Sequence, residues 1–431
     1  MKTKEIYNWL KDSSFRLSTD SRQIAGGEVF FALRGENYDG NKFVPDALEK
    51  GASCAVIDNP LFQSSKTILV DNVLEELQAV ALSRRERLNI PVLAITGSNG
   101  KTTTKEILSR ILSKRFNIHY TRGNLNNHIG VPVTLLTCPE DAEFMIVEMG
   151  ANHKGEIKHL CRIAKPDYGL ITNIGKAHLE GFGSYQGVVE AKTELYDYLE
   201  KNSGVVFYNE NDEVLRQEVS RRKLKNVTYT KPGEHTVEIA GVEQSPELII
   251  QLQLDNQHLT LDTNLFGLHN VENILASLSV GLYFKVVPEK LQTAIESYLP
   301  DNNRSQIFKT GKNTLICDSY NANPVSMDSS IESFSQYPGD NKTVILGDML
   351  ELGDFRIEEH EKVLRKLSAC RDWNILLIGK IFHSLAEKYE FKSFVSRDDL
   401  VTYLSENPVR NSLVLIKGSR ALGLEKIYGL M

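Results

Sequence analysis

A short glycine-rich loop constrains the fold of this chain more than any other feature of its sequence. The loop consists of Gly97, Ser98, Asn99, Gly100, Lys101, Thr102 and Thr103. It follows the apolar run from Val92 to Thr96, which has the length of a strand, and it precedes a segment with the apolar spacing of one helix face. In such a strand-loop-helix unit, glycines let backbone N–H groups approach a phosphate, and the helix N-terminus adds partial positive charge. The sequence therefore predicts a phosphate-binding loop.

Lys101 and Thr102 have specific roles in a loop of this kind. The lysine reaches the terminal phosphates of a nucleotide, and the threonine offers its hydroxyl to Mg²⁺. The loop is two residues shorter than the common G-x-x-x-x-G-K-[ST] form, because position 95 is Ile rather than Gly. The alternative is a chance glycine turn that caps a helix.

Length and composition limit the class of protein. At about 150 residues per domain, 431 residues correspond to two or three domains. A net charge of −6, without a clustered basic segment, argues against a nucleic-acid partner. Five cysteines, an odd number without C-x-x-C spacing, indicate a reducing compartment. With no signal-like N-terminus and no long apolar segment, we expect a cytoplasmic protein that does not insert into membranes.

The order of apolar and polar segments predicts an α/β fold with three domains. Residues 1–88 form a small N-terminal α/β domain, 89–300 a central domain with a doubly wound, mostly parallel sheet, and 301–431 a C-terminal Rossmann-like domain. Residues 231–266 alternate apolar and polar residues, which predicts an antiparallel element within the central domain. The polar stretch 300–306 marks the second boundary.

Polar residues stand where the central strands are expected to end. Glu148 closes FMIVEMG, and Asn173 follows YGLIT, shortly before His178. Ligands of open α/β sheets bind outside the carboxyl ends of the strands, so these side chains should lie near the phosphate loop. Glu148 and His178 are candidate Mg²⁺ ligands, although Mg²⁺ prefers oxygen to nitrogen. A solvated strand-end carboxylate is the alternative for Glu148.

Longer strings along the whole chain resemble the Mur ligases. They are TDSR (19–22), FFALRGENYDG (30–40), ITGSNGKTTTKE (95–106), GNLNNHIGVPVTLL (123–136), VEMGANHKGEI (147–157), TNIGKAHLEGFGS (172–184), AKTEL (191–195), GLHNVENILAS (267–277), DSYNANPVSM (318–327), LGDMLELG (346–353) with His360, and KGSR (417–420). The phosphate loop is also shared with folylpolyglutamate synthases. The narrower strings, such as DSYNANP, resemble the branch that joins D-alanyl-D-alanine to UDP-N-acetylmuramoyl-tripeptide.

The resemblance implies an ATP site, two Mg²⁺ ions and a set of catalytic residues. It implies that residues 97–103 bind ATP, that Thr102 and Glu148 hold one Mg²⁺, and that His178 and a carbamylated Lys192 help to hold a second. It implies that Asn270 and Asn273 face the adenine, and that Arg304 and Asp318 reach the phosphates and ribose. The catalytic set is Lys101, His178, Lys192 and Arg304. Each role has a simpler alternative. Lys192 is then a surface lysine, Asn270 and Asn273 are ordinary polar residues of a helix, and Arg304 is a cation of the linker.

The resemblance also implies two substrate sites. Ser21, Arg22, Leu33, Arg34 and Gly35 match residues that face the UDP-sugar, where arginine suits a diphosphate. The family often has His where this chain has Asn41, and surface arginines are the alternative for positions 22 and 34. Asn321, Asn323, Lys417 and Arg420 match binders of the dipeptide or of the tripeptide end.

The implied activity is an ATP-dependent, carbon-nitrogen bond-forming ligase acting through an acyl phosphate. It would serve peptidoglycan precursor synthesis, and so cell-wall biogenesis, cell shape and division, as a cytoplasmic monomer. Another Mur-type amino-acid ligase and a P-loop nucleotide switch are the alternatives. The switch leaves TDSR and ALRG in the first domain unexplained.

Overall fold

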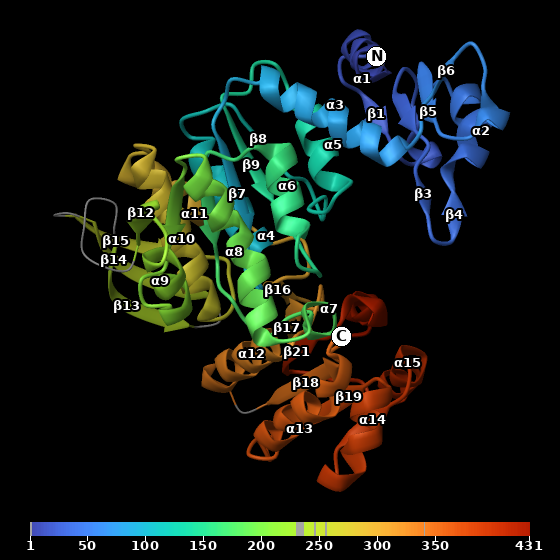
Figure 1. The fold of residues 1–431 in the computed structure, drawn as a ribbon. Coiled ribbons are helices and arrows are strands. Elements are labelled where there is room, and N and C mark those ends of the chain that lie inside the picture. Colours follow the sequence, from blue (N-terminus) through green and yellow to red (C-terminus); the bar gives the residue numbers. More distant parts are fainter. Residues whose placement is uncertain (1, 230–236, 245–246, 255–256, 340) are drawn as a thin grey trace.

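The computed structural model describes residues 2–229, 237–244, 247–254, 257–339 and 341–431, and it confirms an α/β fold built on three mainly parallel sheets (Figure 1). Residues 231–236, 245–246 and 255–256 of the segment expected to be antiparallel lie outside the described ranges. Within these ranges, no helix has both the length and the apolar character that spanning a bilayer requires.

The first sheet is small and parallel, with strand order β1-β2-β5-β6. Its elements are β1 (Leu17–Ser18), β2 (Val29–Phe31), β5 (Cys54–Ile57), β6 (Thr67–Leu69), α1 (Lys2–Asp12), α2 (Val44–Glu49) and α3 (Val73–Arg87). A short antiparallel hairpin, β3 (Arg34–Gly35) with β4 (Tyr38–Asp39), projects from it. The strands follow the brief apolar runs of the sequence, and their inward side chains form the core of this region.

The central sheet has six parallel strands in the order β12-β11-β10-β7-β9-β8. They are β7 (Val92–Thr96), β8 (Ile118–Tyr120), β9 (Phe144–Glu148), β10 (Tyr168–Ile171), β11 (Val205–Tyr208) and β12 (Lys225–Thr228). The helices are α4 (Lys101–Leu112), α5 (Gly130–Leu136), α6 (Glu156–Ala164), α7 (Leu179–Phe182), α8 (Tyr185–Lys201), α9 (Glu213–Ser220), α10 (His269–Tyr283) and α11 (Pro288–Glu296).

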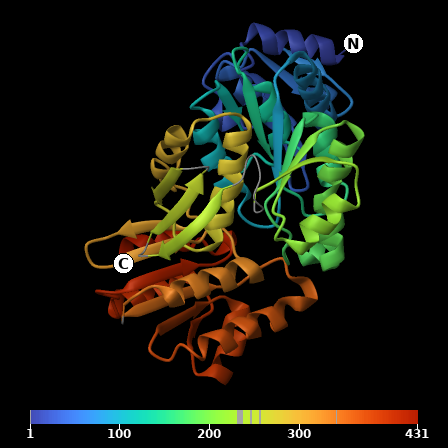
Figure 2. The same ribbon diagram turned by 90° about the vertical axis from the view of Figure 1, so that its left-hand side faces the viewer.

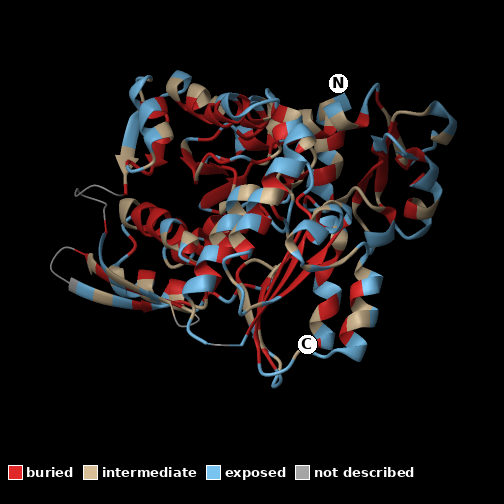
Figure 3. Ribbon diagram, turned by 90° about the horizontal axis from the view of Figure 1, so that it is seen from below, coloured by how far each residue is buried: buried red, intermediate tan, exposed pale blue. Residues whose placement is uncertain are grey.

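Both faces of the central sheet are covered by helices. Alternate residues of β7 enter opposite cores: Val92 and Ala94 pack with α5, α6 and α8, whereas Leu93 and Ile95 pack with α4, α10 and α11. Figure 3 shows the resulting buried strands between helices whose outer faces are exposed. This two-sided burial explains the near-continuous apolar strands and confirms the doubly wound sheet.

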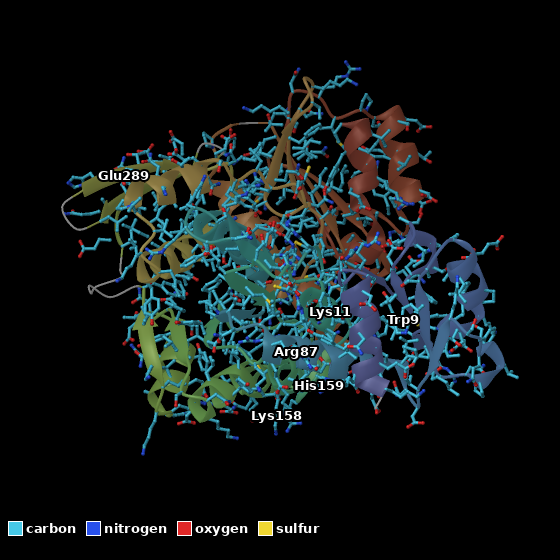
Figure 4. The ribbon with its side chains drawn as sticks, turned by 90° about the horizontal axis from the view of Figure 1, so that it is seen from above. Trp9, Lys11, Arg87, Lys158, His159 and Glu289 are labelled. Atoms are coloured by element: carbon cyan, nitrogen blue, oxygen red, sulfur yellow. The ribbon has the colours of Figure 1, made fainter. Side chains whose placement is uncertain are left out.

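Helix α3 joins the first sheet to the central one. The Arg87 guanidinium lies 4.2 Å from the ring centre of Tyr7 on α1, and His159 of α6 contacts Gln78 of α3 at 3.1 Å. Figure 4 labels Arg87 and His159. Because α3 packs on α1, α5 and α6, it belongs to both regions. The domain limits at 88 and 300 stay a prediction.

An antiparallel sheet of β13 (Glu238–Gln244), β14 (Leu248–Leu254) and β15 (Gln257–Asp262) confirms the alternating pattern (Figure 2). Inward residues of β14, such as Leu248, Ile250 and Leu252, join the α4 and α10 core. At its edge, Gln244 Nε2 donates to the carbonyl of Ser333 in the third region, over 2.9 Å.

The third sheet has the order β16-β17-β21-β18-β19-β20, and only the β16-β17 pair is antiparallel. Its strands are β16 (Gln306–Lys309), β17 (Thr314–Asp318), β18 (Lys342–Gly347), β19 (Asn374–Ile378), β20 (Lys392–Phe394) and β21 (Leu413–Lys417). The covering helices are α12 (Pro324–Gln336), α13 (Arg356–Leu367), α14 (Lys380–Ala386) and α15 (Arg397–Glu406). This confirms the Rossmann-like layer predicted for the last third.

Candidate active site

The phosphate loop connects β7 to α4 through two glycines that no other residue could replace without a clash. Gly97 has φ +146°, and a Cβ there would lie 2.0 Å from Thr172 Oγ1. Gly100 has φ +79°, and a Cβ there would lie 2.3 Å from Asn273 Oδ1. The loop therefore packs closely between the end of β10 and α10, as its glycines allow.

The end of β10 fixes the loop by hydrogen bonds. The Asn99 N–H donates to Asn173 Oδ1 over 3.0 Å, and Thr172 Oγ1 donates to the Asn99 carbonyl over 2.6 Å. Ser98 Oγ donates to the Gly175 carbonyl over 3.0 Å. These contacts hold the loop conformation that a phosphate requires.

Lys101 bends back over this loop. Its ammonium donates to the carbonyls of Gly97 and Ser98 over 2.6 and 3.1 Å. Burial lowers the pKa of Lys101 to about 8, against the opposing influence of the Glu148 carboxylate. The cation is thus held where it can contact phosphate oxygens, and near neutral pH it keeps its charge.

Glu148 is buried at the end of β9, with 1% of its surface exposed, so the alternative of a solvated carboxylate is wrong. Its Oε1 accepts hydrogen bonds from Thr102 Oγ1 at 3.2 Å and from Asn126 Nδ2 at 2.8 Å. Its Oε2 lies 3.5 Å from Lys105 Nζ, but it accepts no hydrogen bond from any described residue. A buried carboxylate oxygen beside a threonine hydroxyl is the kind of ligand that Mg²⁺ prefers.

Lys105 and Asn126 are site residues that the sequence analysis did not single out. Lys105 is fully buried on α4, one turn after Lys101, and its ammonium offsets the charge of Glu148. The signal was available: a lysine four residues after Lys101 lies on the same helix face. Asn126 lies in GNLNNHIG, and nothing local connects it to Glu148.

His178 and Lys192 lie at opposite ends of α7. His178 precedes this helix with φ +51°, and its Nδ1 is 2.5 Å from Glu351 Oε2 of the third region. The imidazole lowers the pKa of Glu351 through this contact. Lys192, on α8, is 2% exposed, so the surface-lysine alternative is wrong. Burial holds the pKa of its amine well below the ordinary value, and the positive charge of Lys101 contributes.

Asn270 and Asn273 are buried on α10 rather than solvated. Asn270 Nδ2 donates to the Phe266 carbonyl at 2.8 Å, and Asn273 Nδ2 donates to Asn270 Oδ1 at 2.9 Å. Asn273 Oδ1 also accepts from Thr104 Oγ1 at 3.2 Å. The pair therefore links α10 to the start of α4.

The third sheet places an ion pair opposite the phosphate loop, in which Lys417 is buried and the Asp318 side chain is 14% exposed. Lys417 Nζ lies 2.5 Å from Asp318 Oδ2, which also accepts from Ser330 Oγ at 2.9 Å. Burial alone would raise the pKa of Asp318, but the Lys417 ammonium outweighs it and the pKa lies below its usual range. Asn323 caps α12, and its Nδ2 donates to Asn99 Oδ1 of the loop over 2.7 Å.

Tyr320 lies between two of the predicted arginines. The Arg304 guanidinium is 3.7 Å from the ring centre, and Arg420 is 5.1 Å from it while donating to the hydroxyl at 3.2 Å. Asn321 contributes its carbonyl to Lys417 at 3.4 Å. Arg304 is half-buried, and its Nε has no hydrogen-bond partner among the described residues.

A cavity of about 1170 Å³ brings most of these residues together. Of the predicted residues, it is lined by Ser98, Asn99, Gly100, Lys101, Thr102, Thr103, Glu148, His178, Asn270, Asn273, Arg304, Asp318, Asn321, Asn323 and Lys417. Gly97, Lys192 and Arg420 are not among the lining residues. Groups of three His, Cys, Asp or Glu side chains suited to a metal do not occur in the described part of the chain.

The predicted residues of the first region also lie outside this cavity. Ser21 and Leu33 are buried, Arg22 pairs with Asp20, and Arg34 Nε lies 2.8 Å from Asp58 Oδ1. Gly35 belongs to the short hairpin. Asn41 is fully buried, and its amide donates to Asp39 and Asp58.

These features define a P-loop nucleotide-binding protein in which two sheets share one cavity. Sequence profiles agree: "Mur ligase family, catalytic domain" matches residues 16–96, "Mur ligase middle domain" residues 95–281, and "Mur ligase, glutamate ligase domain" residues 303–420.

Individual relatives match almost the whole chain. UDP-N-acetylmuramoyl-tripeptide--D-alanyl-D-alanine ligase of Bacillus subtilis is 34% identical, covering 95% of this chain and 92% of that protein. The Synechocystis protein of the same name is 35% identical, with 95% and 90% covered. A crystal structure of MurF from Acinetobacter baumannii superposes with a TM-score of 0.85 at 31% identity, covering 96% and 92%. The structure of MurF from Thermotoga maritima in complex with ADP superposes with a TM-score of 0.82 at 26% identity, and 96% of each chain is covered. The chain belongs to the Mur ligase family.

Proposed function

We propose that this protein is the ATP-dependent ligase that adds D-alanyl-D-alanine to UDP-N-acetylmuramoyl-tripeptide in peptidoglycan precursor synthesis. The observation that carries the proposal is full-length similarity, at 30 to 35% identity, to curated ligases named for this reaction. The phosphate loop and the third-sheet residues, which line one cavity, supply a place for the chemistry.

The family resemblance implies a two-step reaction. The tripeptide carboxylate attacks the γ-phosphorus of ATP. The bond between this phosphorus and the oxygen of ADP breaks, and an acyl phosphate forms. The neutral amine of the dipeptide then attacks the acyl carbon, the bond from that carbon to the phosphate oxygen breaks, and the nitrogen loses one proton, which the leaving phosphate takes up. Lys101 and the loop N–H groups stabilise charge on the transferring phosphoryl group, and Arg304 assists from the third sheet. With substrates bound, residues of both sheets would exclude the water that hydrolyses an acyl phosphate.

Mg²⁺ is the second proposed cofactor. Thr102 and Glu148 would hold one ion, because the buried Glu148 Oε2 has a free lone pair beside the hydroxyl. When bound, such an ion neutralises charge on the phosphates. His178 and Lys192 would contribute to a second ion, and Asn270 and Asn273 would face the adenine.

Lys192 would need carbamylation to bind a cation. Only a neutral amine reacts with CO₂, and the depressed pKa of this buried lysine favours that form. We expect labelled bicarbonate to give a carbamate signal that acid abolishes. Lys192→Ala should be inactive and partly rescued by short carboxylic acids, and Lys192→Arg should stay inactive. Lys158→Ala, on the exposed face of α6, is the matched control. Near-normal activity of Lys192→Arg would contradict the carbamate.

The substrate sites and the compartment complete the proposal. The UDP-sugar would bind at Ser21, Arg22, Leu33, Arg34 and Gly35, and the dipeptide near Asn321, Asn323, Lys417 and Arg420. We propose that the enzyme works as a cytoplasmic monomer, where ATP is abundant and its five free cysteines stay reduced.

One assay tests the function. The protein is incubated with ATP, Mg²⁺, D-alanyl-D-alanine and UDP-muramoyl-tripeptides that carry either diaminopimelate or lysine, and phosphate release and product mass are measured. Condensation with a single amino acid instead would favour another Mur-type ligase. ATP hydrolysis that needs no UDP-sugar would favour a nucleotide switch.

A further inference from the structure

Glu351 of the third region contacts His178 of the central region across the cavity's edge. The two side chains approach to 2.5 Å between Oε2 and Nδ1. Both residues have left-handed backbones, with φ +64° for Glu351 and φ +51° for His178. Non-glycine residues adopt this conformation at a cost, and they keep it where the surrounding structure imposes it.

The third region holds the Glu351 segment rigidly. The Asp348 carboxylate accepts the N–H groups of Ile381 and Phe382 at the start of α14, over 2.9 and 2.8 Å. The Met349 N–H donates to His360 Nε2 over 3.0 Å, and the Leu350 N–H donates to Ser419 Oγ over 2.9 Å. The LGDMLELG string and His360 therefore act as a support for the next residue, Glu351.

This support depends on a glycine facing Asp348. A Cβ at Gly379, which has φ +118°, would lie 2.3 Å from Asp348 Cγ. The His360 ring is fixed in turn, because its Nδ1 lies 2.6 Å from the Arg356 carbonyl. Glu351 thus moves with the third sheet as a unit.

On the central side, His178 immediately precedes α7, and Lys192 Nζ lies against the ring of Phe182 at the far end of that helix. The His178 carbonyl accepts the N–H groups of Gly181 and Phe182 over 3.0 and 3.1 Å. The Phe182 ring centre lies 5.4 Å from Lys192 Nζ. A contact that orients His178 therefore also orients α7, the helix whose Phe182 ring lies against Lys192.

In this contact, His178 is the hydrogen-bond donor and Glu351 is the acceptor. A carboxylate only accepts hydrogen bonds, so the proton must be on His178 Nδ1, and in the neutral ring the lone pair is then on Nε2. We propose that Glu351 is a positioning residue, which sets the tautomer and orientation of His178 when the third region docks on the central one. The inference rests on the proposed function, because it makes docking a condition for a complete catalytic centre.

A second ion pair at the same interface provides the control. Lys176 Nζ lies 3.7 Å from Glu359 Oε1, which also pairs with Lys362. This pair joins the same two regions without touching His178. If Glu351 merely held the regions together, Glu359→Gln and Glu351→Gln would have similar effects.

The test uses variants that respect the left-handed backbones. Glu351→Gly removes the carboxylate and relieves the strain, and Glu351→Gln keeps a neutral acceptor. His178→Asn retains a residue type that tolerates positive φ. Ring-nitrogen NMR of histidine-labelled full-length protein, with a non-hydrolysable ATP analogue and UDP-muramoyl-tripeptide, reports the tautomer. Steady-state kinetics give kcat and KM.

We expect Glu351→Gly to lower kcat by about tenfold or more, in the range of losses seen when a partner that orients a ligating histidine is removed. KM for the UDP-sugar should not change, and the His178 signals should leave the Nδ1–H form. Glu351→Gln should lie between Glu351→Gly and the wild type, and Glu359→Gln should change neither kcat nor the signals. In the His178→Asn background, Glu351→Gly should have no further effect.

Three results would overturn the inference: equal losses in Glu351→Gln and Glu359→Gln, an unchanged His178 tautomer in Glu351→Gly, or additive losses in the double variant. Failure of the proposed function is distinguishable. It would show as no condensation product from the wild type, and the ring-nitrogen spectra would still test the contact.

Discussion

The cavity beside the central sheet and the region of the first sheet proposed to bind the UDP-sugar differ in how their charges are arranged. Around the cavity, Glu148, Lys105 and Lys417 are buried and the Asp318 side chain is 14% exposed, and each charge lies within 3.5 Å of an opposite one. In the first region, the Arg22 side chain is 85% exposed and pairs with its near neighbour Asp20. Arg34 is half-exposed beside Asp58.

The difference indicates what each region can contribute. Buried, paired charges cost several kcal/mol to separate, so they fix geometry and couple catalysis to folding. Exposed pairs are worth little, about 0 to 1 kcal/mol, so their arginines can exchange an aspartate for a diphosphate at small cost. We therefore expect the central region to position the reacting groups and the first region to bind its ligand reversibly.

The largest effect should come from the phosphate loop. Lys101→Ala removes the cation proposed to contact the γ-phosphoryl group, and we expect turnover to fall by about 10³-fold, as for loss of one preorganised donor in a dry site. UDP-muramoyl-tripeptide binding, measured without ATP by calorimetry, should survive. Lys158→Ala is the control. Joint loss of turnover and UDP-sugar binding would mean that the variant is misfolded.

The ion pair of the third sheet should dominate stability. Lys417→Met leaves the largely covered Asp318 carboxylate, 14% exposed, without its cation, which should lower the free energy of unfolding by about 3 kcal/mol in chemical denaturation. The folded-state pKa of Asp318 is depressed, so this stabilisation is present at neutral pH and lost as the pH falls through that pKa. The difference in unfolding free energy between the wild type and the variant should therefore become smaller in acid. A gap that is constant with pH would contradict the ion-pair account.

Local pattern was sufficient for some parts of the molecule. The loop, β7 and α4 were predictable because glycine geometry and apolar spacing act within some 20 residues, and Ile107, Leu108, Ile111 and Leu112 are all buried as expected. The alternating segment likewise formed the antiparallel sheet wherever it is described.

Contacts between regions were not predictable in the same way. The bond from Asn323 to Asn99 and the pair of Glu351 with His178 join residues 224 and 173 positions apart, and they depend on how two sheets dock. Family resemblance pointed to Asn323 and Lys417, but not to their contacts with the loop and with Asp318. Tyr320, which lies between Arg304 and Arg420, had no local signal.

The first region should show a moderate effect on binding and almost none on stability. Arg34→Met removes a guanidinium that can pair with a diphosphate, and we expect UDP-muramoyl-tripeptide affinity to fall about tenfold. The free energy of unfolding should change by less than about 1 kcal/mol, because the Arg34 side chain is 49% exposed and Asp58, at 11% exposed, keeps its hydrogen bond from Asn41. Calorimetry and denaturation of the same sample measure both. A stability loss as large as that of Lys417→Met would remove the distinction between the two regions.

The smallest expected effect is the pH dependence of nucleotide affinity. It distinguishes a buried lysine, which titrates, from an arginine, which stays charged. The pKa of Lys101 is about 8, so the ammonium is largely charged at pH 7 and largely neutral at pH 9. Affinity for a non-hydrolysable ATP analogue should therefore weaken several-fold over that range, with phosphate binding itself opposing deprotonation. Lys101→Arg keeps its charge throughout and should bind with an affinity independent of pH. UDP-muramoyl-tripeptide affinity should also stay constant, since arginines serve that site. If Lys101→Arg showed the same decline as the wild type, another group would be titrating, and the buried lysine would not explain the pH dependence.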